Sequence, residues 1–451
     1  MSEVKKIKKG LDIKLAGKAE KVLEKADRSE TYAIKPSNFP GLTPKLKVKV
    51  DAEVKAGDSL FFDKYCPEIN FASPVSGKVI AVNRGERRKI LEVVIQADAE
   101  IQYKEFKKAD PNGLSREEIK GELLKSGLWS FVRQRPYDVI AKPEDTPKAI
   151  FVSAFDTAPL AADIDYLLEG EAEAFQVGLD ALAKLTDGKV YLNTNPNFNQ
   201  NKTFSEAKNV EVCQFSGVHP AGNVGVQIHH ISPMNKGEVA WVVRPQEVVF
   251  IGRLFAKGIY DVSRKIALCG SEVKTPCYFE TIQGASVRNI LKGKLKDDEK
   301  IRIISGNVLT GEQIFEDGFL NFYDSQITVI PEGDKFEFLG WALPGLQKFS
   351  MSKTFFSWLT PNKEYRLDAN LHGEHRAFVM TGEYDKVLPM DVLPQQLIKS
   401  IMIEDIDQME QLGIYEVAPE DLALCEFVCT SKINVQDLVR KGIDLMIKEM
   451  S

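Results

Sequence analysis

The sequence predicts a multidomain α/β protein: a β-rich N-terminal part, then alternating strands and helices, then a helical C-terminal part. Short β-branched runs broken by Gly, Pro, Asp and Asn fill residues 46–95, a pattern typical of short strands joined by tight turns. Apolar runs alternate with helically spaced apolar residues over 149–261, which indicates βαβ units on a parallel sheet. From residue 388 onward the apolar spacing is helical.

The β-rich stretch has the organisation of a small carrier-type barrel. Gly57 and Gly77 lie at turns that need a positive φ, which glycine adopts at no steric cost. The pattern resembles the biotinyl/lipoyl barrel-sandwich hybrid domain, whose hairpin tip presents a lysine to a modifying enzyme. Lys64 lies at that tip, but the residues that flank a biotin or lipoyl acceptor are missing, which favours a docking or binding platform over a modified carrier. The predicted strands are 47–50, 77–82 and 91–95.

The middle of the chain is predicted to form a Rossmann-like α/β unit that begins after a helical patch at 116–127. Phe175, Leu179, Leu182 and Leu185 share one face of a helix. The predicted strands are 149–155, 189–193 and 210–215, and the predicted helices are 158–170, 171–185 and 246–261.

A third region is predicted to be a small β-grasp module, and a fourth to be mostly helical. A hairpin is expected over 326–341, with its turn at 331–333, and one helix over 393–413 with Gly413 at its C-cap. The β-grasp elements are a strand at 264–270, a short helix at 284–293 and the stretch 301–311; the later helices are 418–429 and 434–450. The expected domains are 1–105, 106–260, 261–345 and 346–451.

Composition restricts the class of protein. The chain has 451 residues, 43% apolar and 27% charged, with a net charge of -6, which is typical of a globular protein and gives no general case for nucleic-acid binding. Six scattered cysteines contain no CxxC pair, so we expect a reducing compartment rather than a disulfide framework or zinc ribbon. No uncharged apolar run reaches 18 residues, and the N-terminus lacks a signal-peptide core.

Charge is nevertheless uneven along the chain. Residues 1–25 hold eight lysines and four acids, whereas residues 400–431 hold eight acids and no Lys or Arg. Solvated surface explains both stretches. The alternative is that the basic end faces an anionic membrane leaflet or an acidic partner, because each Lys near such a surface contributes about 1 kcal/mol.

Common cofactor motifs are missing from the sequence. No G-x-G pair exists among the 31 glycines, so the dinucleotide fingerprint is absent despite the predicted βαβ units. There is also no Walker A loop, G-x-S-x-G elbow or H-E-x-x-H motif. These results argue against a nucleotide-binding or hydrolytic site of a familiar type.

Pairs of metal-ligating residues are also weak candidates. His372 and His375 are three residues apart but lack a third ligand. His229 and His230 are adjacent and would point to opposite faces of a strand. Cys425 and Cys429, one helical turn apart, cannot hold a [4Fe–4S] cluster that needs four thiolates; as small apolar residues in a helix core they need no further role. We therefore predict no metal site.

One glycine- and proline-rich stretch, 215–233, is a candidate crevice loop between predicted strands. His219, Pro220 and Gly222 lie at its centre. Such a backbone can approach a ligand closely, although an interdomain turn would have the same composition.

Several stretches together resemble the A subunit of the bacterial sodium-pumping NADH:quinone oxidoreductase. The resemblance covers the whole chain from residue 7 and extends more distantly to the iron–sulfur subunit of Rnf complexes and the flavin/NADH subunit of complex I. The stretches are IKKGLDIKLAGKAE, IKPSNFPGLTPKLKVK, ASPVSGKVIAVNRGERRKILEVVI, FSGVHPAGNVGVQIHHISP, ISGNVLTG, FLGWALPG and EDLALCEFVC.

The resemblance implies a barrel-sandwich hybrid, a Rossmann-like, an SLBB-type β-grasp and a C-terminal helical domain. It also implies a peripheral subunit on the cytoplasmic face of the inner membrane, beside an integral membrane subunit, that contributes to quinone binding. The glycine-rich flavin loop and the cysteine-rich cluster motifs of the two distant relatives are absent here. We therefore expect no redox cofactor on this chain, with NADH, flavins and an iron–sulfur cluster in other subunits.

The quinone contact is predicted at residues 30–42. Tyr32 and Phe39 offer aromatic surface, Lys35 and Asn38 offer donors, and Pro36 stiffens the segment. A proline-rich loop that crosses the end of the barrel is the alternative, in which case the quinone site lies wholly on a neighbouring subunit. A carrier domain modified at Lys64 and a flavoprotein without a glycine fingerprint are the competing functions.

Overall fold

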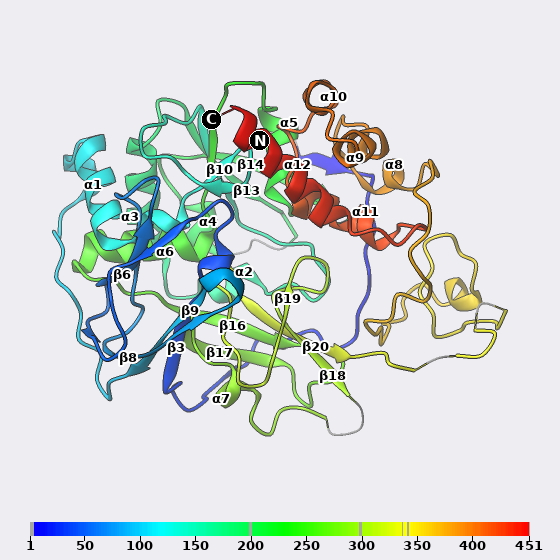
Figure 1. The fold of residues 1–451 in the computed structure, drawn as a ribbon, viewed down its shortest axis with the longest axis horizontal. Helices are drawn as coiled ribbons and strands as arrows, with labels where there is room; N and C mark the ends of the chain where they lie inside the picture. Colours follow the sequence, from blue (N-terminus) through cyan, green and yellow to red (C-terminus); the bar gives the residue numbers. More distant parts are fainter. Residues whose placement is uncertain (1–3, 198–200, 297–299, 336, 341, 451) are drawn as a thin grey trace.

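The structure, a computed structural model, describes residues 4–197, 201–296, 300–335, 337–340 and 342–450. Their strands form four sheets (Figure 1). The barrel and the α/β part lie on the left of the view, the β-grasp part at the bottom, and the C-terminal helices at the upper right. No helix in these ranges is both long enough and apolar enough to cross a membrane.

The N-terminal barrel consists of two small antiparallel sheets, in the orders β3-β9-β8-β5 and β4-β6-β7. Val79, Val93 and Ile95 on β8 and β9 are fully buried, and Val94 is buried too, in a separate small cluster with Ala33 and Phe319. Gly77 (φ 151°) is needed where β8 pairs with β9, because a Cβ there would lie 1.9 Å from the carbonyl oxygen of Gln96. The elements are β3 (Thr31–Ile34), η1 (Pro36–Asn38), β4 (Pro44–Leu46), β5 (Glu53–Val54), β6 (Ser59–Asp63), β7 (Asn70–Ala72), β8 (Gly77–Arg84), η2 (Glu86–Arg88) and β9 (Ile90–Ala97).

Two barrel predictions have different outcomes. The hairpin tip is confirmed, because β6 pairs with β7 and the exposed Lys64 lies in the turn between them. The strand expected at 47–50 is wrong. The chain turns at 49–52 instead, with Asp51 at φ 72°, and its amide donates to the carbonyl of Val79.

The α/β part is a seven-stranded sheet in the order β1-β14-β13-β12-β15-β10-β11. Its β1-β14-β13-β12-β15 part is parallel, as the βαβ pattern predicts. Helices α3 and α6 pack against each other. The strands are β10 (Arg133–Arg135), β11 (Val139–Ile140), β12 (Ala149–Ser153), β13 (Lys189–Thr194), β14 (Glu211–Gly217) and β15 (Ala240–Val242). The helices are η3 (Pro111–Gly113), α1 (Arg116–Ser126), η4 (Leu128–Phe131), α2 (Ile164–Leu167), α3 (Ala172–Lys184), α4 (Lys202–Ser205), α5 (Val224–Ile231) and α6 (Pro245–Lys257).

The β-grasp part is a six-stranded sheet in the order β19-β18-β20-β16-β17-β2, with an apolar core of its own around Ile266, Phe279 and Val329. The hairpin predicted at 326–341 is wrong for the described residues. β20 is flanked by β16 and β18, so neither of its edges is free for a returning strand; Phe336 and Trp341 lie outside the described residues. The elements are β2 (Leu23–Glu24), β16 (Ser263–Cys269), β17 (Cys277–Ile282), α7 (Arg288–Leu291), β18 (Ile301–Ser305), β19 (Glu312–Ile314) and β20 (Gln326–Pro331).

The C-terminal part is helical from residue 384 onward, as expected. The single helix predicted at 393–413 is instead two helices, because Glu404 adopts φ 58° and Asp405 caps the second one by accepting from the Gln408 amide at 3.0 Å. The elements are η5 (Phe356–Leu359), α8 (Tyr384–Val387), α9 (Pro394–Met402), α10 (Ile406–Gln411), η6 (Pro419–Leu422), α11 (Ala423–Phe427) and α12 (Val435–Met450).

Residues 4–28 contact three other parts of the molecule before the barrel begins. Strand β1 (Lys5–Ile7) extends the α/β sheet beside β14, Leu15 bridges to Tyr365, and β2 pairs with β17 at the edge of the β-grasp sheet. The N-terminal segment therefore connects parts of the fold that are far apart in the sequence. The domain limits expected at 105, 260 and 345 stay predictions.

Candidate functional site

The predicted quinone segment, 30–42, lies between the barrel and the β-grasp part. Tyr32 is on β3, which pairs with β9, and its backbone bridges to Ala285 of the β-grasp part. Pro36 begins the turn η1, which has Asn38 as its last residue. Tyr32 is 1% and Phe39 2% exposed, whereas Lys35 and Asn38 are half-buried. The segment thus places its two aromatic side chains inside the molecule.

Both predicted donors of the segment bond to the β-grasp part. Lys35 Nζ donates to the carbonyl oxygen of Phe319 at 3.2 Å and to Asn321 Oδ1 at 3.0 Å. Asn38 acts as an acceptor, because its Oδ1 receives the amide of Phe322 at 3.0 Å. The structure therefore brings these residues together, across a contact with residues 319–322.

An aromatic cluster continues from this contact into the α/β part. The ring of Phe39 lies 4.5 Å from that of Phe71 and 4.7 Å from that of Phe322. Phe322 in turn stacks on Phe131, at 4.4 Å between centroids. Barrel, β-grasp and α/β parts thus meet in one apolar layer, where aromatic pairs contribute about 0.5–1.5 kcal/mol beyond their buried area.

Charged side chains, two half-buried arginines and the buried Glu247, lie around Tyr323 next to this layer. The guanidinium groups of Arg133 and Arg244 lie 5.0 Å and 5.7 Å from the Tyr323 ring centroid. The Tyr323 hydroxyl donates to the carbonyl oxygen of Ser130 at 2.7 Å. Glu247 accepts the Arg244 amide at 2.8 Å at the start of α6. Cation–π contact and hydrogen bonding thus hold the aromatic ring at the junction.

Burial shifts the pKa values of three charged residues around Tyr323. It raises the pKa of Glu247, and it raises the pKa of Asp324, although nearby arginines oppose both shifts. Burial also lowers the pKa of Arg264 to about 10. Two carboxyl groups with raised pKa values, Glu247 and Asp324, thus lie beside the aromatic layer.

Sequence reasoning did not select this buried group. Tyr323 carries no motif, and Arg244 and Glu247 stand out only as charges that interrupt the apolar stretch 239–255. A charge within an apolar run is the signal that could have found them, because a buried charge needs a partner.

The predicted crevice loop is shorter than expected. Residues 218–223 form a loop after β14, and the second half of the predicted stretch is helix α5. His219 is 3% exposed; its Nδ1 lies 3.1 Å from Thr157 Oγ1, and the same hydroxyl accepts the Gly222 amide at 2.9 Å. Burial lowers the pKa of His219. The peptide bond before Pro220 is cis.

The N-terminal segment covers this loop. The amide of Leu11 donates to the carbonyl oxygen of His219 at 2.8 Å, and the amide of His219 donates to Asp12 Oδ1 at 2.8 Å. The loop lies beside the carboxyl end of the parallel strand β12, where the Ser153 hydroxyl donates to the carbonyl oxygen of Gly222 at 3.1 Å. Open α/β sheets bind ligands at this edge. A role as a crevice loop stays a prediction.

The histidine and cysteine pairs form no metal site in the described ranges, where no group of three or more His, Cys, Asp or Glu could hold an ion. His229 and His230, which would point to opposite faces of a strand, lie instead on α5. His229 Nδ1 lies 2.8 Å from Glu416 Oε2, and its Nε2 accepts the Asp391 amide at 3.1 Å. The thiols of Cys425 and Cys429 are free and buried.

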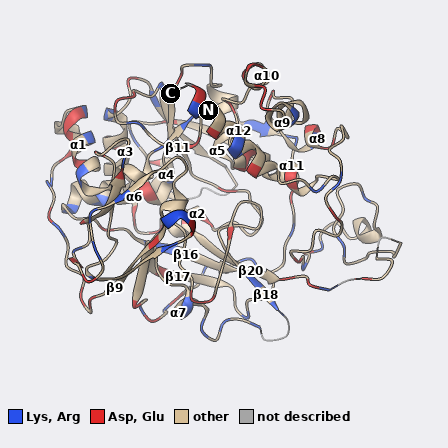
Figure 2. Cartoon of the chain, viewed as in Figure 1, with Lys and Arg blue, Asp and Glu red and all other residues tan. Residues whose placement is uncertain are grey.

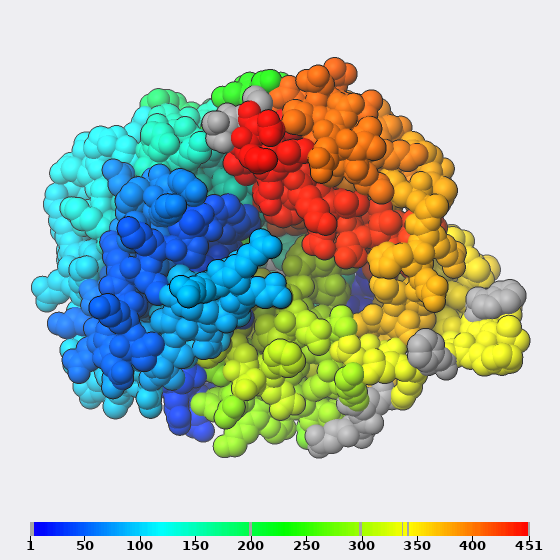
Figure 3. Space-filling model, in the orientation of Figure 1, coloured from blue at the N-terminus to red at the C-terminus, as the bar shows by residue number. Residues whose placement is uncertain are grey.

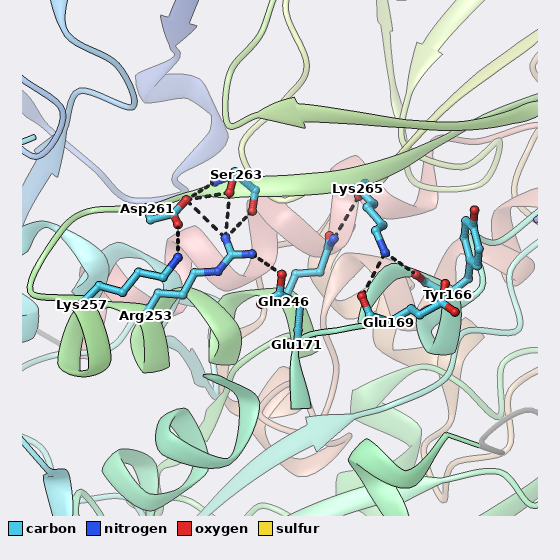
Figure 4. Close-up of polar contacts among 9 residues, drawn as sticks. All are labelled: Tyr166, Glu169, Glu171, Gln246, Arg253, Lys257, Asp261, Ser263 and Lys265. Carbon is cyan, nitrogen blue, oxygen red and sulfur yellow. Dashed lines mark hydrogen bonds and ion pairs between the residues drawn. The ribbon is translucent and has the colours of Figure 1, made fainter. Parts of the chain in front are cut away.

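A small hollow of about 190 Å³, lined by polar and apolar side chains, lies between α6 and strands β16 and β17. Figure 4 shows polar contacts among its lining residues and their neighbours. Arg253 bonds there to Glu171 at 2.6 Å and to the carbonyl oxygen of Ser263 at 2.7 Å, and Lys265 Nζ donates to the carbonyl oxygens of Tyr166 and Glu169. The hollow is smaller than typical ligand pockets of about 300–1,000 Å³, and these cations already have protein partners.

Family models match three stretches of the chain. They are the NqrA N-terminal barrel-sandwich hybrid domain at 5–98, the NqrA second alpha/beta domain at 114–260, and the NQRA C-terminal domain, of SLBB type, at 265–315. The A subunit of the Na(+)-translocating NADH-quinone reductase of Yersinia pestis bv. Antiqua (strain Angola) is 38% identical over 438 residues, 96% of this chain and 97% of its own. The protein of the same name from Vibrio parahaemolyticus is 38% identical over 446 residues, 98% and 99% of the two chains.

The chain belongs to the NqrA family, the A subunits of Na(+)-translocating NADH-quinone reductases. The resemblance seen in the sequence is thereby confirmed, and so is the multidomain α/β fold class. By name, the relatives are subunits of an oxidoreductase. Two structures of an NAD+-reducing [NiFe]-hydrogenase also align, with TM-scores of 0.35 and 0.37 and 11% and 12% identity, over 75% of this chain and 59% and 60% of theirs.

Proposed function

We propose that this chain is a peripheral subunit of a sodium-translocating NADH:quinone reductase on the cytoplasmic face of the bacterial inner membrane. In this proposal it contributes to quinone binding, carries no redox cofactor of its own, and binds an integral membrane subunit. The single observation that carries the proposal is 38% identity over nearly the whole chain to proteins of that name. The membrane subunits, NADH, flavins and iron–sulfur cluster belong to the rest of the complex.

Residues 30–42 are the proposed quinone contact. They lie where three parts of the chain meet, and small-molecule sites occur preferentially at such interfaces. Burying a methylene contributes about 0.8 kcal/mol, so two isoprenoid units of five carbons each supply about 8 kcal/mol before the costs of ordering are subtracted. That gross figure corresponds to about micromolar affinity. Because Phe39 is buried against Phe71 and Phe322, a quinone reaches its ring only when these neighbouring side chains move.

The second candidate is a docking subunit whose neighbour holds the entire quinone site. One observation favours it: Lys35 and Asn38 already bond to residues 319–322, so both polar groups have protein partners without a ligand. The segment then acts as a structural clamp between the barrel and the β-grasp part.

Purification from the native membrane tests membership of the complex. A tagged chain should bring integral membrane subunits with it after mild detergent extraction, and the chain expressed alone should be colourless. Recovery of the tagged chain without those subunits, or a stoichiometric flavin or cluster on the chain alone, contradicts the proposal. An unmodified intact mass excludes a carrier function at Lys64.

Lys35→Met in the assembled complex separates the two candidates. Loss of a charged donor costs roughly 1.5–3 kcal/mol, so a quinone contact predicts about a tenfold or larger rise in the KM for quinone. NADH oxidation with an artificial acceptor should not change. The control is Lys45→Met, an exposed barrel lysine. An unchanged KM in a folded Lys35→Met complex favours the docking subunit.

A further inference from the structure

Residues 342–363 form a surface lobe at the right-hand edge of the molecule, yellow to orange in Figures 1 and 3. The Phe356 amide donates to the carbonyl oxygen of Pro344 at 2.8 Å, and Lys363 Nζ donates to the carbonyl oxygen of Leu346 at 2.7 Å. The two halves of the lobe therefore lie side by side, with the turn η5 in the second half.

Large apolar side chains on this lobe face solvent. The exposed fractions are 55% for Phe356, 50% for Trp358 and 60% for Leu359, all on η5, and 47% for Leu343 and 59% for Leu346 in the adjacent half. Exposed apolar residues that are scattered singly need no explanation, but contiguous ones mark a surface that contacts a partner or a membrane.

The inner side chains hold the lobe in place. The Phe349 ring lies 5.5 Å from that of Tyr365 and 5.8 Å from that of Phe427. Ser357, in the middle of η5, is 3% exposed and its hydroxyl donates to the carbonyl oxygen of Lys348 at 2.5 Å. Packing of Phe349 and the hydrogen bond of Ser357 therefore hold η5 in place, with its apolar side chains on the surface.

Every formal charge in the lobe is positive. Residues 342–363 contain three lysines and no Asp or Glu. Lys353 is exposed, and Lys14 of the basic N-terminal segment lies next to the lobe, where its Nζ donates to the carbonyl oxygen of Pro361 at 3.0 Å. Acidic residues flank the lobe at Glu337, which pairs with Lys348, and at Glu364. Elsewhere in the same view both signs of charge are interspersed (Figure 2).

We propose that this lobe inserts Phe356, Trp358 and Leu359 into the interface of an anionic phospholipid bilayer, with Lys353 and Lys14 at the headgroups. Aromatic and aliphatic side chains beside lysines are typical of interfacial membrane contacts, and anionic headgroups attract such lysines. Protein interfaces, by contrast, are depleted in lysine. This inference specifies how the proposed peripheral subunit contacts the membrane, and it rests on that proposed function.

Co-flotation of the purified full-length chain with vesicles tests the lipid contact directly. We expect binding to equimolar phosphatidylcholine and phosphatidylglycerol, weaker binding to phosphatidylcholine alone, and release by high salt. In the triple variant Phe356→Ser, Trp358→Ser, Leu359→Ser, the affinity for the vesicles should fall by a factor of about ten or more. The double variant Lys353→Glu, Lys14→Glu should bind the anionic vesicles more weakly, and its binding to phosphatidylcholine vesicles should not change.

The matched control is Phe315→Ser, because Phe315 is 78% exposed but lies next to β19, outside the lobe. All variants should keep the melting temperature of the parent, since the altered side chains are exposed. The proposal is overturned when the parent chain binds neither vesicle, or when the folded triple variant binds as well as the parent.

A third outcome identifies a protein partner. If the parent does not bind vesicles and the triple variant no longer co-purifies with the membrane subunits, the lobe docks on protein and the lipid proposal fails. Co-purification of the parent with those subunits is a separate measurement, so failure of the lobe and failure of the proposed function can be told apart.

Discussion

Asp421 illustrates how one buried carboxyl group joins the C-terminal helices to the α/β part. Its Oδ2 lies 3.1 Å from Arg135 Nη1 and accepts the Ala418 amide at 2.9 Å. The neighbouring helix α5 has Gly225 there, where a Cβ would lie 2.3 Å from the carboxyl oxygens. Burial raises the pKa of Asp421 to about 6, against the opposing effect of Arg135.

The stability contributed by Asp421 should therefore depend on pH. An unfolded Asp loses its proton near pH 4, whereas the folded state keeps it to about pH 6. The contribution is full below about pH 4, falls as the pH rises to about 6, and is constant above that. Urea titrations measure the free energy of unfolding of the parent and of Asp421→Asn. The difference, parent minus variant, should fall by about 3 kcal/mol between about pH 4 and pH 6.

The control for this measurement is Asp27→Asn, which alters an exposed carboxylate and should show no comparable change. A difference between parent and Asp421→Asn that does not vary with pH would mean that the buried carboxyl group keeps its ordinary pKa.

At the scale of elements, the packing of α3 on α6 depends on two glycines. A Cβ on Gly178 of α3 would lie 2.0 Å from the carbonyl oxygen of Val248, and one on Gly252 of α6 would lie 1.7 Å from that of Ala174. The two helix backbones thus approach more closely than any side chain permits. Periodicity predicts both helices correctly but says nothing about this distance.

Gly252→Ala is expected to destabilise the protein. Overpacking of this kind costs about 1–3 kcal/mol, which exceeds the gain in helix propensity of about 1 kcal/mol. Denaturant unfolding monitored by circular dichroism measures the change. Gly121→Ala in α1 is the matched control, because a Cβ there meets no atom within 4 Å, and it should be neutral or stabilising. Equal effects of the two substitutions would contradict the close helix contact.

The whole molecule is connected by its N-terminal segment as well as by its domain interfaces. Ile7 of β1 is 4% exposed and pairs with Gly217 at the edge of the α/β sheet. The same segment covers the His219 loop and supports the lobe through Lys14. Residues expected to belong with the barrel thus stabilise three other parts of the fold.

Ile7→Ala should lower the free energy of unfolding by about 2–4 kcal/mol, because it removes a buried side chain from the sheet edge. Thermal unfolding checks the stability, and size-exclusion chromatography checks whether the edge of β14 becomes prone to association. Val4→Ala, which alters a 41% exposed side chain, should have little effect. A melting temperature unchanged by Ile7→Ala would show that β1 does not hold the edge.

Local patterns predicted the elements that form from neighbouring residues. The barrel strands β8 and β9, helices α1, α3 and α6, and the parallel strands follow from apolar spacing and turn residues, since those features depend on short-range geometry. The wrong predictions, namely the 326–341 hairpin, the strand at 47–50 and the undivided helix at 393–413, concern segments whose conformation depends on distant partners or on a single positive φ.

The sequence by itself determined the fold class and, through its stretches of family resemblance, the family to which the chain belongs. Only the tertiary structure decided that Lys35, Asn38 and Phe39 lie against residues 319–323, that Arg133 lies over the Tyr323 ring, and that the N-terminal segment reaches distant sheets. The physical reason is that these contacts join residues hundreds of positions apart, and burial, rather than spacing along the chain, determines which side chains meet.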